Sequence, residues 1–332
     1  RRRRSGDGDA RRTPVKADVD EAALAESRAF NEDLRLRLAQ MPPVHTVPPH
    51  VARQARRENR SVFPPLEFVP QARDMAIPTR NGEIRLRVLA PEREAAGVYL
   101  HLHGGGWVLG ECDEQDVRLW SLVEATGLCA VSVGYRLAPE HPYPAAPDDC
   151  EDAALWLLEH GQRDLGVPEL FTIGGESAGA HLSVTTLLRL RDRHGITGAF
   201  RAANLVYGGY DLTATPSQRN WGDREYILST PSMRWFARSF VGDRSFEELR
   251  DPDISPLYAE LHDLPPAYFS VGDLDPLLDD SLFMSMRWRA AGNESELHVW
   301  PECVHAFLAF PLSLARRAHE EQYDFLRRRI SD

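Results

Sequence analysis

The chain has 332 residues, of which 42% are apolar and 27% are charged, and its formal net charge at pH 7 is −11. This composition is typical of a globular protein with a sizeable buried core. The acidic balance argues against nucleic acid as a partner, because phosphate binding needs a basic face. No stretch is apolar over the length needed to span a membrane.

Residues 1–17 are expected to form a disordered tail. They carry the basic run RRRRSGDGDARR, which lacks the apolar segment of a secretion signal. The only lysine of the chain, Lys16, lies in this tail. Schiff-base, serine–lysine and phosphate-loop chemistry all need a lysine on a rigid scaffold, so the sequence argues against these three mechanisms.

The cysteines predict reduced, mostly buried thiols, and we therefore expect a cytoplasmic protein. They show neither CxxC pairing nor the spacing of metal ligands, so no metal site is expected. The four are Cys112, Cys129, Cys150 and Cys303.

Residues 18–67 predict two helices. Apolar residues recur with helical spacing between 18 and 41, and the proline-rich run MPPVHTVPPH ends that pattern. The run VARQARREN predicts a second, shorter helix.

From residue 68 to 332, short apolar runs rich in β-branched and aromatic residues alternate with helical patterns. This alternation predicts an α/β fold with a mostly parallel sheet, covered by helices on both faces. The helical patterns end at glycines, as helices commonly do; they span 113–127, 147–161, 177–195 and 281–292.

Residues 212–256 interrupt this alternation. The segment is too long for a simple connection between a strand and a helix. Together with residues 18–67, it is expected to form a helical cap over the carboxyl edge of the sheet, where open α/β sheets place their ligands.

The sequence GESAG, residues 175–179, marks the candidate nucleophile, Ser177. A serine in a sharp turn between a strand and a helix brings its flanking residues so close together that only small ones fit. The alternative is a glycine-rich turn that only packs or that binds phosphate. Glu176 disfavours phosphate binding, because its carboxylate would repel the anion.

The sequence HLHGGGW, residues 101–107, closes another apolar strand. Its three glycines leave backbone N–H groups unobstructed, and such groups stabilise the negative oxygen of a tetrahedral intermediate. The candidate donors are Gly104, Gly105, Gly106 and, directly after the nucleophile, Ala178. His103 is expected to hold this loop by a hydrogen bond.

A serine hydroxyl needs a base, and on this architecture the acid and then the histidine follow the nucleophile in the chain. His305 follows the apolar run ELHVW and is the candidate base. Asp273 and Asp275 both follow the run AYFS, and spacing alone does not choose between them. Asp279 and Asp280 begin the next helix, where carboxylates favour the positive end of the dipole.

Five motifs in consistent order resemble the hormone-sensitive-lipase-like group of α/β-hydrolases, which includes many microbial carboxylesterases. The motifs are HGGGW, YRLAPEHPYPAAPDD (135–149), GESAG, DLDPLLDD and VHAF, and the similarity covers about residues 80–310. The resemblance implies an eight-stranded, mostly parallel sheet with a helical cap. Within the second motif, we expect Arg136 and Glu140 to pair.

The resemblance also implies roles for individual residues. The acid is the aspartate directly before Pro-Leu, which is Asp275, with Ser177 as nucleophile and His305 as base. The oxyanion donors are chiefly Gly104 and Gly105, together with Ala178. The chain departs from the family after the run ANLV, where YGGYDLT stands in place of a commoner proline.

The expected reaction is hydrolysis of short- to medium-chain acyl esters through an acyl-enzyme, without a cofactor or metal. A lactone or arylamide hydrolase would use the same residues. A small-molecule receptor is a further alternative, but receptors of this kind typically lack the histidine that His305 supplies. Homodimers are common in the family, so a homodimer is an expectation. An apolar substrate pocket is predicted from Trp107, Tyr207, Trp221, Tyr226, Trp235 and Phe236.

Overall fold

The computed structural model describes residues 15–16, 19–224 and 226–331. Its strands form one sheet, in the order β1-β9-β8-β7-β6-β4-β5-β3-β2. The strands are β1 (Val15–Lys16), β2 (Ala72–Thr79), β3 (Gly82–Leu89), β4 (Gly97–Leu102), β5 (Leu128–Gly134), β6 (Phe171–Glu176), β7 (Phe200–Val206), β8 (Ala267–Leu274) and β9 (Ser295–Val304).

The predicted mostly parallel α/β sheet is confirmed. Strand β3 pairs antiparallel with β2 and β5, and every other pairing in the sheet is parallel. Strands β2 to β9 are the eight expected strands. Most of the tail predicted as disordered lies outside the described residues, but Val15–Lys16 pairs with β9 and adds a ninth strand. This short strand covers backbone groups that would otherwise form an open sheet edge.

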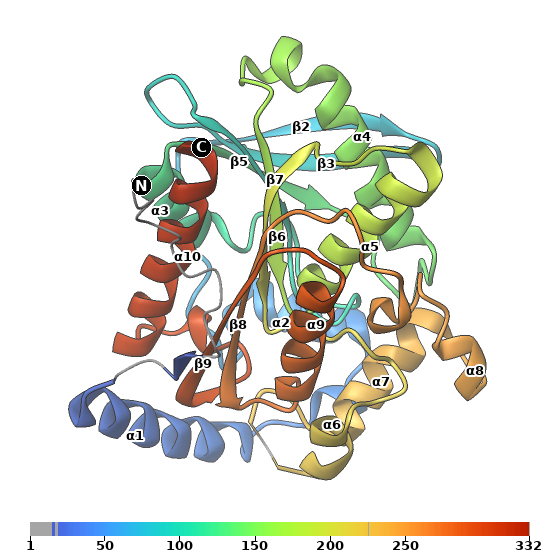
Figure 1. Ribbon diagram of the computed structural model, residues 1–332. Helices are drawn as coiled ribbons and strands as arrows, with labels where there is room; N and C mark the ends of the chain where they lie inside the picture. The colour runs from blue at the N-terminus through green and yellow to red at the C-terminus, as the bar shows by residue number, and fades with distance from the viewer. Residues whose placement is uncertain (1–14, 17–18, 225, 332) are drawn as a thin grey trace, which may run out of the picture.

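Helices cover both faces of the sheet. Helices α3 and α10 pack on one face, and α4, α5 and α9 pack on the other (Figure 1). The helices are α1 (Glu21–Leu38), α2 (Pro49–Arg57), α3 (Asp116–Thr126), α4 (Ala145–Leu165), α5 (Ala178–His194), α6 (Pro216–Trp221), α7 (Thr230–Val241), α8 (Phe246–Leu249), α9 (Leu278–Ala290) and α10 (Ser313–Ser331). None of those in the described ranges is long and apolar enough to cross a membrane.

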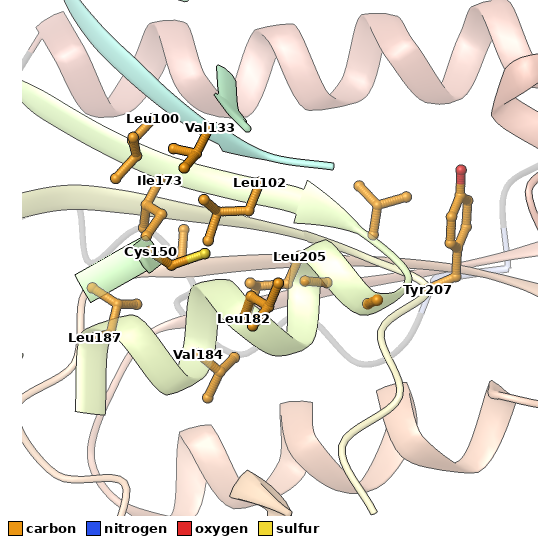
Figure 2. Close-up of a cluster of buried hydrophobic side chains, with 14 of the residues drawn as sticks. Leu100, Leu102, Val133, Cys150, Ile173, Leu182, Val184, Leu187, Leu205 and Tyr207 are labelled. Carbon is orange, nitrogen blue, oxygen red and sulfur yellow. The ribbon is translucent and has the colours of Figure 1, made fainter. Parts of the chain in front are cut away.

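The main core lies between the sheet and α5. Leu182 and Leu187 of α5 pack with Leu102, Ile173 and Leu205 of the central strands, and all five are buried (Figure 2). Burying a leucine or isoleucine side chain stabilises the fold by about 1.5–3 kcal/mol. The carboxyl ends of β4 and β6 are thereby held rigidly, and the candidate site begins at these ends.

The segment between β7 and β8 contains α6, α7 and α8. Helices α1, α6 and α7 lie beyond the carboxyl ends of β8 and β9, at the bottom of the molecule in Figure 1. Helix α7 begins with a capping box, in which Ser229 and Ser232 exchange side-chain to backbone hydrogen bonds.

Asp280, near the start of α9, holds the segment that follows β7. Its carboxylate is fully buried and accepts hydrogen bonds from the backbone N–H groups of Tyr210 and Asp211 and from the side chains of Thr215 and Gln218. Burial raises the pKa of Asp280 to about 7, although these four donors favour the charged form. The sequence predicted only an interaction with the dipole of its own helix.

Candidate active site

Ser177 occupies a strained turn between β6 and α5. Its backbone angles are φ 56° and ψ −119°, a region that non-glycine residues rarely adopt. A Cβ atom added at Gly175 would lie 2.1 Å from the carbonyl oxygen of Leu102, and one at Gly179 would lie 1.8 Å from the same oxygen. The flanking glycines are therefore required by close backbone contact, as the sequence argument proposed.

Two hydrogen bonds connect Ser177, His305 and Asp275. Nε2 of His305 lies 3.0 Å from Oγ of Ser177, and Nδ1 of His305 lies 2.8 Å from Oδ2 of Asp275. Asp275 is 1% exposed, and its other carboxylate oxygen accepts the N–H of Leu277 at 2.8 Å. The imidazole is thus placed between a hydroxyl and a fixed carboxylate, the arrangement that activates a serine for nucleophilic attack.

Asp273, the alternative acid, has a different contact. Its Oδ1 accepts the backbone N–H of Glu302 at 2.8 Å, which joins the carboxyl ends of β8 and β9. The structure therefore brings only Asp275 to His305. Residues two positions apart on a strand point to the same face, and β8 ends at Leu274, between the two aspartates, so alternation alone could not separate them.

The glycine loop after β4 presents backbone N–H groups beside Ser177. Gly105 and Gly106 have φ values of 117° and 59°, in the region that favours glycine. Within the described residues, no hydrogen-bond acceptor engages the N–H groups of Gly105, Gly106 or Ala178. Ala178 is also the first residue of α5, where the helix dipole favours a negative oxygen.

Gly104 differs from the prediction. Its N–H donates to Oε1 of Glu176 at 2.9 Å, so it is not available to an oxyanion. The expectation that Gly104 is a chief donor is therefore wrong in this geometry, and Gly105, Gly106 and Ala178 remain as the candidate donors. The physical reason is the reach of the glutamate side chain from the neighbouring strand β6.

Glu176 belongs to a buried polar network that the sequence did not reveal. Its Oε2 lies 3.0 Å from Nε2 of His101 and 2.5 Å from a guanidinium nitrogen of Arg118, while Nδ1 of His101 contacts the hydroxyl of Ser132 at 2.8 Å. Burial alone would raise the pKa of Glu176, but Arg118, His101 and the N–H of Gly104 hold it well below its usual range. Glu176 is therefore ionised and paired at neutral pH.

His103 holds the glycine loop, as expected. Its Nδ1 donates to the carbonyl oxygen of Gly104 at 2.8 Å, and its ring stacks on Tyr135 with centroids 4.2 Å apart. Burial lowers the pKa of His103, so the ring is neutral. The side chain of His103 therefore supports the loop and makes no hydrogen bond to Ser177.

A cavity of about 1440 Å³ contains Ser177 and His305. Residues from α7 and from the loops around α2 line it; the ring of Phe236 on α7 lies where a Cβ of Gly106 would be, within 2.3 Å. Of the predicted pocket residues, four line the cavity: Trp107, Tyr207, Tyr226 and Phe236.

Trp221 and Trp235 do not line the cavity, so their prediction as pocket residues is corrected. The indole N–H of Trp221 donates to the carbonyl oxygen of Leu228 at 3.0 Å, which fixes the loop between α6 and α7. Trp235 packs edge-on against Phe236, with ring centroids 4.8 Å apart. It supports the ring that lines the cavity.

The expected pair between Arg136 and Glu140 is also wrong. Arg136 pairs with the fully buried Asp149 at 2.8 Å, and Glu140 pairs with Arg53 at 2.9 Å. Arg53 comes from α2, so this second pair ties the N-terminal helices to the loop after β5.

Comparisons with known proteins agree with this fold. A family model described as the alpha/beta hydrolase fold matches residues 99–309. The carboxylic ester hydrolase LipN of Mycobacterium tuberculosis is 34% identical over 240 residues, which are 71% of this chain and 64% of LipN. The esterase LipI of the same organism is 34% identical over 257 residues, 75% of this chain and 77% of LipI.

Among solved structures, an esterase of Pyrobaculum calidifontis superimposes with a TM-score of 0.79 at 30% identity. The superposition covers 89% of this chain and 97% of that esterase. The chain thus spans just under two thirds of LipN but nearly all of this archaeal enzyme.

Proposed function

The chain belongs to the alpha/beta hydrolase family, in its hormone-sensitive-lipase-like group of carboxylic ester hydrolases, and we propose that it is a serine carboxylesterase acting on short- to medium-chain acyl esters. The observation that carries this proposal is the pair of hydrogen bonds at His305, whose Nε2 accepts from the hydroxyl of Ser177 at 3.0 Å and whose Nδ1 donates to Asp275 at 2.8 Å. LipN and LipI, with esterase names, support the class of reaction.

In the first half of the proposed reaction, Oγ of Ser177 attacks the acyl carbon of the ester while Nε2 of His305 takes its proton. Asp275 orients the imidazole and stabilises its charged form. The N–H groups of Gly105, Gly106 and Ala178 stabilise the oxyanion; one such donor contributes about 3 kcal/mol to the barrier reduction in related chemistry. His305 then gives its proton to the leaving alcohol.

In the second half, a water molecule attacks the acyl-enzyme. His305 takes a proton from this water and returns it to Oγ of Ser177 as the carboxylic acid leaves. The protons balance in both halves, because every proton that moves has a donor and an acceptor among Ser177, His305, the substrate and the attacking water.

We further propose that residues 18–67 and 212–256 form a cap that selects substrates. Phe236 and Tyr226 from the insert and Val44 and Val51 from the N-terminal segment line the cavity around Ser177. Their apolar surfaces favour an apolar acyl or alcohol group.

The test is hydrolysis of p-nitrophenyl acetate, butyrate, hexanoate, octanoate and palmitate by the wild type and by Ser177→Ala. We expect kcat/KM to be highest for one of the shorter esters, to fall strongly at palmitate, and to be lost in the variant. An acyl p-nitroanilide and a lactone in the same panel test the alternative substrates. Faster cleavage of either would replace the ester assignment, and retained activity in Ser177→Ala would remove Ser177 as nucleophile.

A further inference from the structure

A group of polar side chains faces the cavity on the side of the sheet opposite α5. The group, which we call the α3–α10 subsite, consists of Arg118 on α3, Tyr207 directly after β7, and His319 and Tyr323 on α10, and all four line the cavity that contains Ser177. Helices α3 and α10 pack together on this face (Figure 1). Figure 2 shows the ring of Tyr207 pointing away from α5, toward the same face.

Three hydrogen-bond donors of this subsite have no protein acceptor in the described ranges. Arg118 uses Nε for Gln115 and Nη2 for Glu176, while its Nη1 has no such partner. The hydroxyl groups of Tyr207 and Tyr323 have none either. They differ from the hydroxyl of Tyr268, which also lacks a partner but is sealed in the core.

One acceptor accompanies the three donors. Nε2 of His319 donates to the carbonyl oxygen of Leu308 at 3.1 Å, so Nδ1 carries the free lone pair. Burial and the nearby charge of Arg118 lower the pKa of His319 to about 4, and the ring is therefore neutral at pH 7. The excess of donors indicates that the subsite is complementary to an oxygen that accepts hydrogen bonds.

The charges nearby favour an uncharged oxygen. The guanidinium of Arg118 is already neutralised by the carboxylate of Glu176, and Glu320 at the exposed edge of the subsite adds a second negative charge. A substrate carboxylate would find no uncompensated positive charge among the four residues of the subsite and would be repelled by Glu320. A ketone or ester carbonyl accepts hydrogen bonds without this repulsion.

We propose that the α3–α10 subsite binds a second, uncharged carbonyl oxygen of the substrate, and that oxo esters or diesters are the preferred substrate class. This inference rests on the proposed esterase function, because the subsite and Ser177 share one cavity. It assigns Arg118, Tyr207 and Tyr323 as residues that determine specificity.

The test compares two pairs of esters that differ only by replacement of a ketone C=O group with CH(CH3). The acyl pair is p-nitrophenyl 4-oxopentanoate and p-nitrophenyl 4-methylpentanoate; the alcohol pair is acetonyl acetate and isobutyl acetate. For each pair, the preference is the ratio of the two kcat/KM values. Because intrinsic reactivity is the same for every enzyme variant, a change in the ratio between variants reports the subsite alone.

We expect Tyr323→Phe to lower the preference for the oxo ester about fivefold in at least one pair, the loss of one hydrogen bond to a neutral acceptor. Tyr207→Phe should lower it in the same pair. The matched control, Tyr268→Phe, removes a sealed hydroxyl and should leave both ratios unchanged.

Equal ratios in the wild type, Tyr207→Phe and Tyr323→Phe would overturn the subsite and show that its donors face only water. Such a result would leave the esterase proposal intact, since all four esters would still be cleaved. If the wild type cleaved none of the four, the proposed function itself would fail.

Discussion

The backbone N–H of Gly104 donates a hydrogen bond to the carboxylate of Glu176 at 2.9 Å. This bond joins the turn that carries Ser177 to the loop that presents the free N–H groups of Gly105 and Gly106. The proposed nucleophile and the proposed oxyanion donors are therefore fixed relative to each other by the side chain of the residue directly before Ser177. Arg118 compensates the charge of that side chain.

Replacing Glu176 tests this connection. In Glu176→Gln, the guanidinium of Arg118 loses its counter-charge, and we expect the free energy of unfolding at pH 7 to fall by about 3 kcal/mol. The pKa of Glu176 is lower in the folded than in the unfolded state. The difference in unfolding free energy between the wild type and the variant is therefore largest above about pH 4 and becomes smaller as the pH falls below that value. Urea denaturation across pH measures both effects.

The matched control for this substitution is Glu58→Gln, which breaks an exposed pair with Arg60. We expect little change in stability, because exposed ion pairs contribute little. Equal stabilities of Glu176→Gln and the wild type would show that the network does not hold the loop.

The two aspartates after β8 should behave differently. Asp275→Asn removes the carboxylate that contacts Nδ1 of His305, and we expect kcat to fall about 10⁴-fold. Asp273→Asn alters a contact with the backbone of Glu302 and should lower stability by about 1 kcal/mol while retaining most of kcat. Steady-state kinetics on p-nitrophenyl butyrate measure kcat for both variants. A larger loss of kcat in Asp273→Asn than in Asp275→Asn would show that Asp273, and not Asp275, is the acid that orients His305.

The strained backbone of Ser177 should be visible in stability. Glycine tolerates φ 56° and ψ −119° without steric cost, whereas alanine does not. We therefore expect the free energy of unfolding of Ser177→Gly, measured by urea denaturation, to be about 1–2 kcal/mol higher than that of Ser177→Ala. Both variants should be inactive. If the two variants were equally stable, the turn would carry no strain.

Because Asp280 is buried, its contribution to the stability of the fold should decrease as the pH rises. Its folded pKa of about 7 lies above the unfolded value of about 4, so the folded state binds the proton more tightly. Its contribution is full below about pH 4 and is lost as the pH rises to about 7, by at most about 1.4 kcal/mol per pH unit. The difference between the wild type and Asp280→Asn, measured by urea denaturation from pH 5 to 8, should change in this direction, and a constant difference would contradict it.

Local patterns explain why much of the fold could be predicted. Glycines at 175 and 179 around a serine report a backbone contact that only small residues permit, and the structure shows that contact with Leu102. Helices that end at glycine and apolar strands are likewise marked by residue type. These features are visible in sequence because the residues that mark them lie within one turn or element, even where the residue that they contact, such as Leu102, is distant in the chain.

The errors involve partners that are distant in the chain. Gly104 is blocked by the side chain of Glu176, 72 residues away, and Glu140 pairs with Arg53, 87 residues away. No local pattern records such contacts. Trp235 was misplaced for a related reason, since helical periodicity does not say which face of α7 turns toward the cavity.

The most direct test of the account is covalent labelling by diethyl p-nitrophenyl phosphate, followed by peptide mapping by mass spectrometry. The account predicts one diethylphosphoryl group on Oγ of Ser177, complete loss of ester hydrolysis in step with labelling, and no label in Ser177→Ala. A label on a different residue, or full activity of the labelled enzyme, would contradict the assignment of Ser177 as the nucleophile.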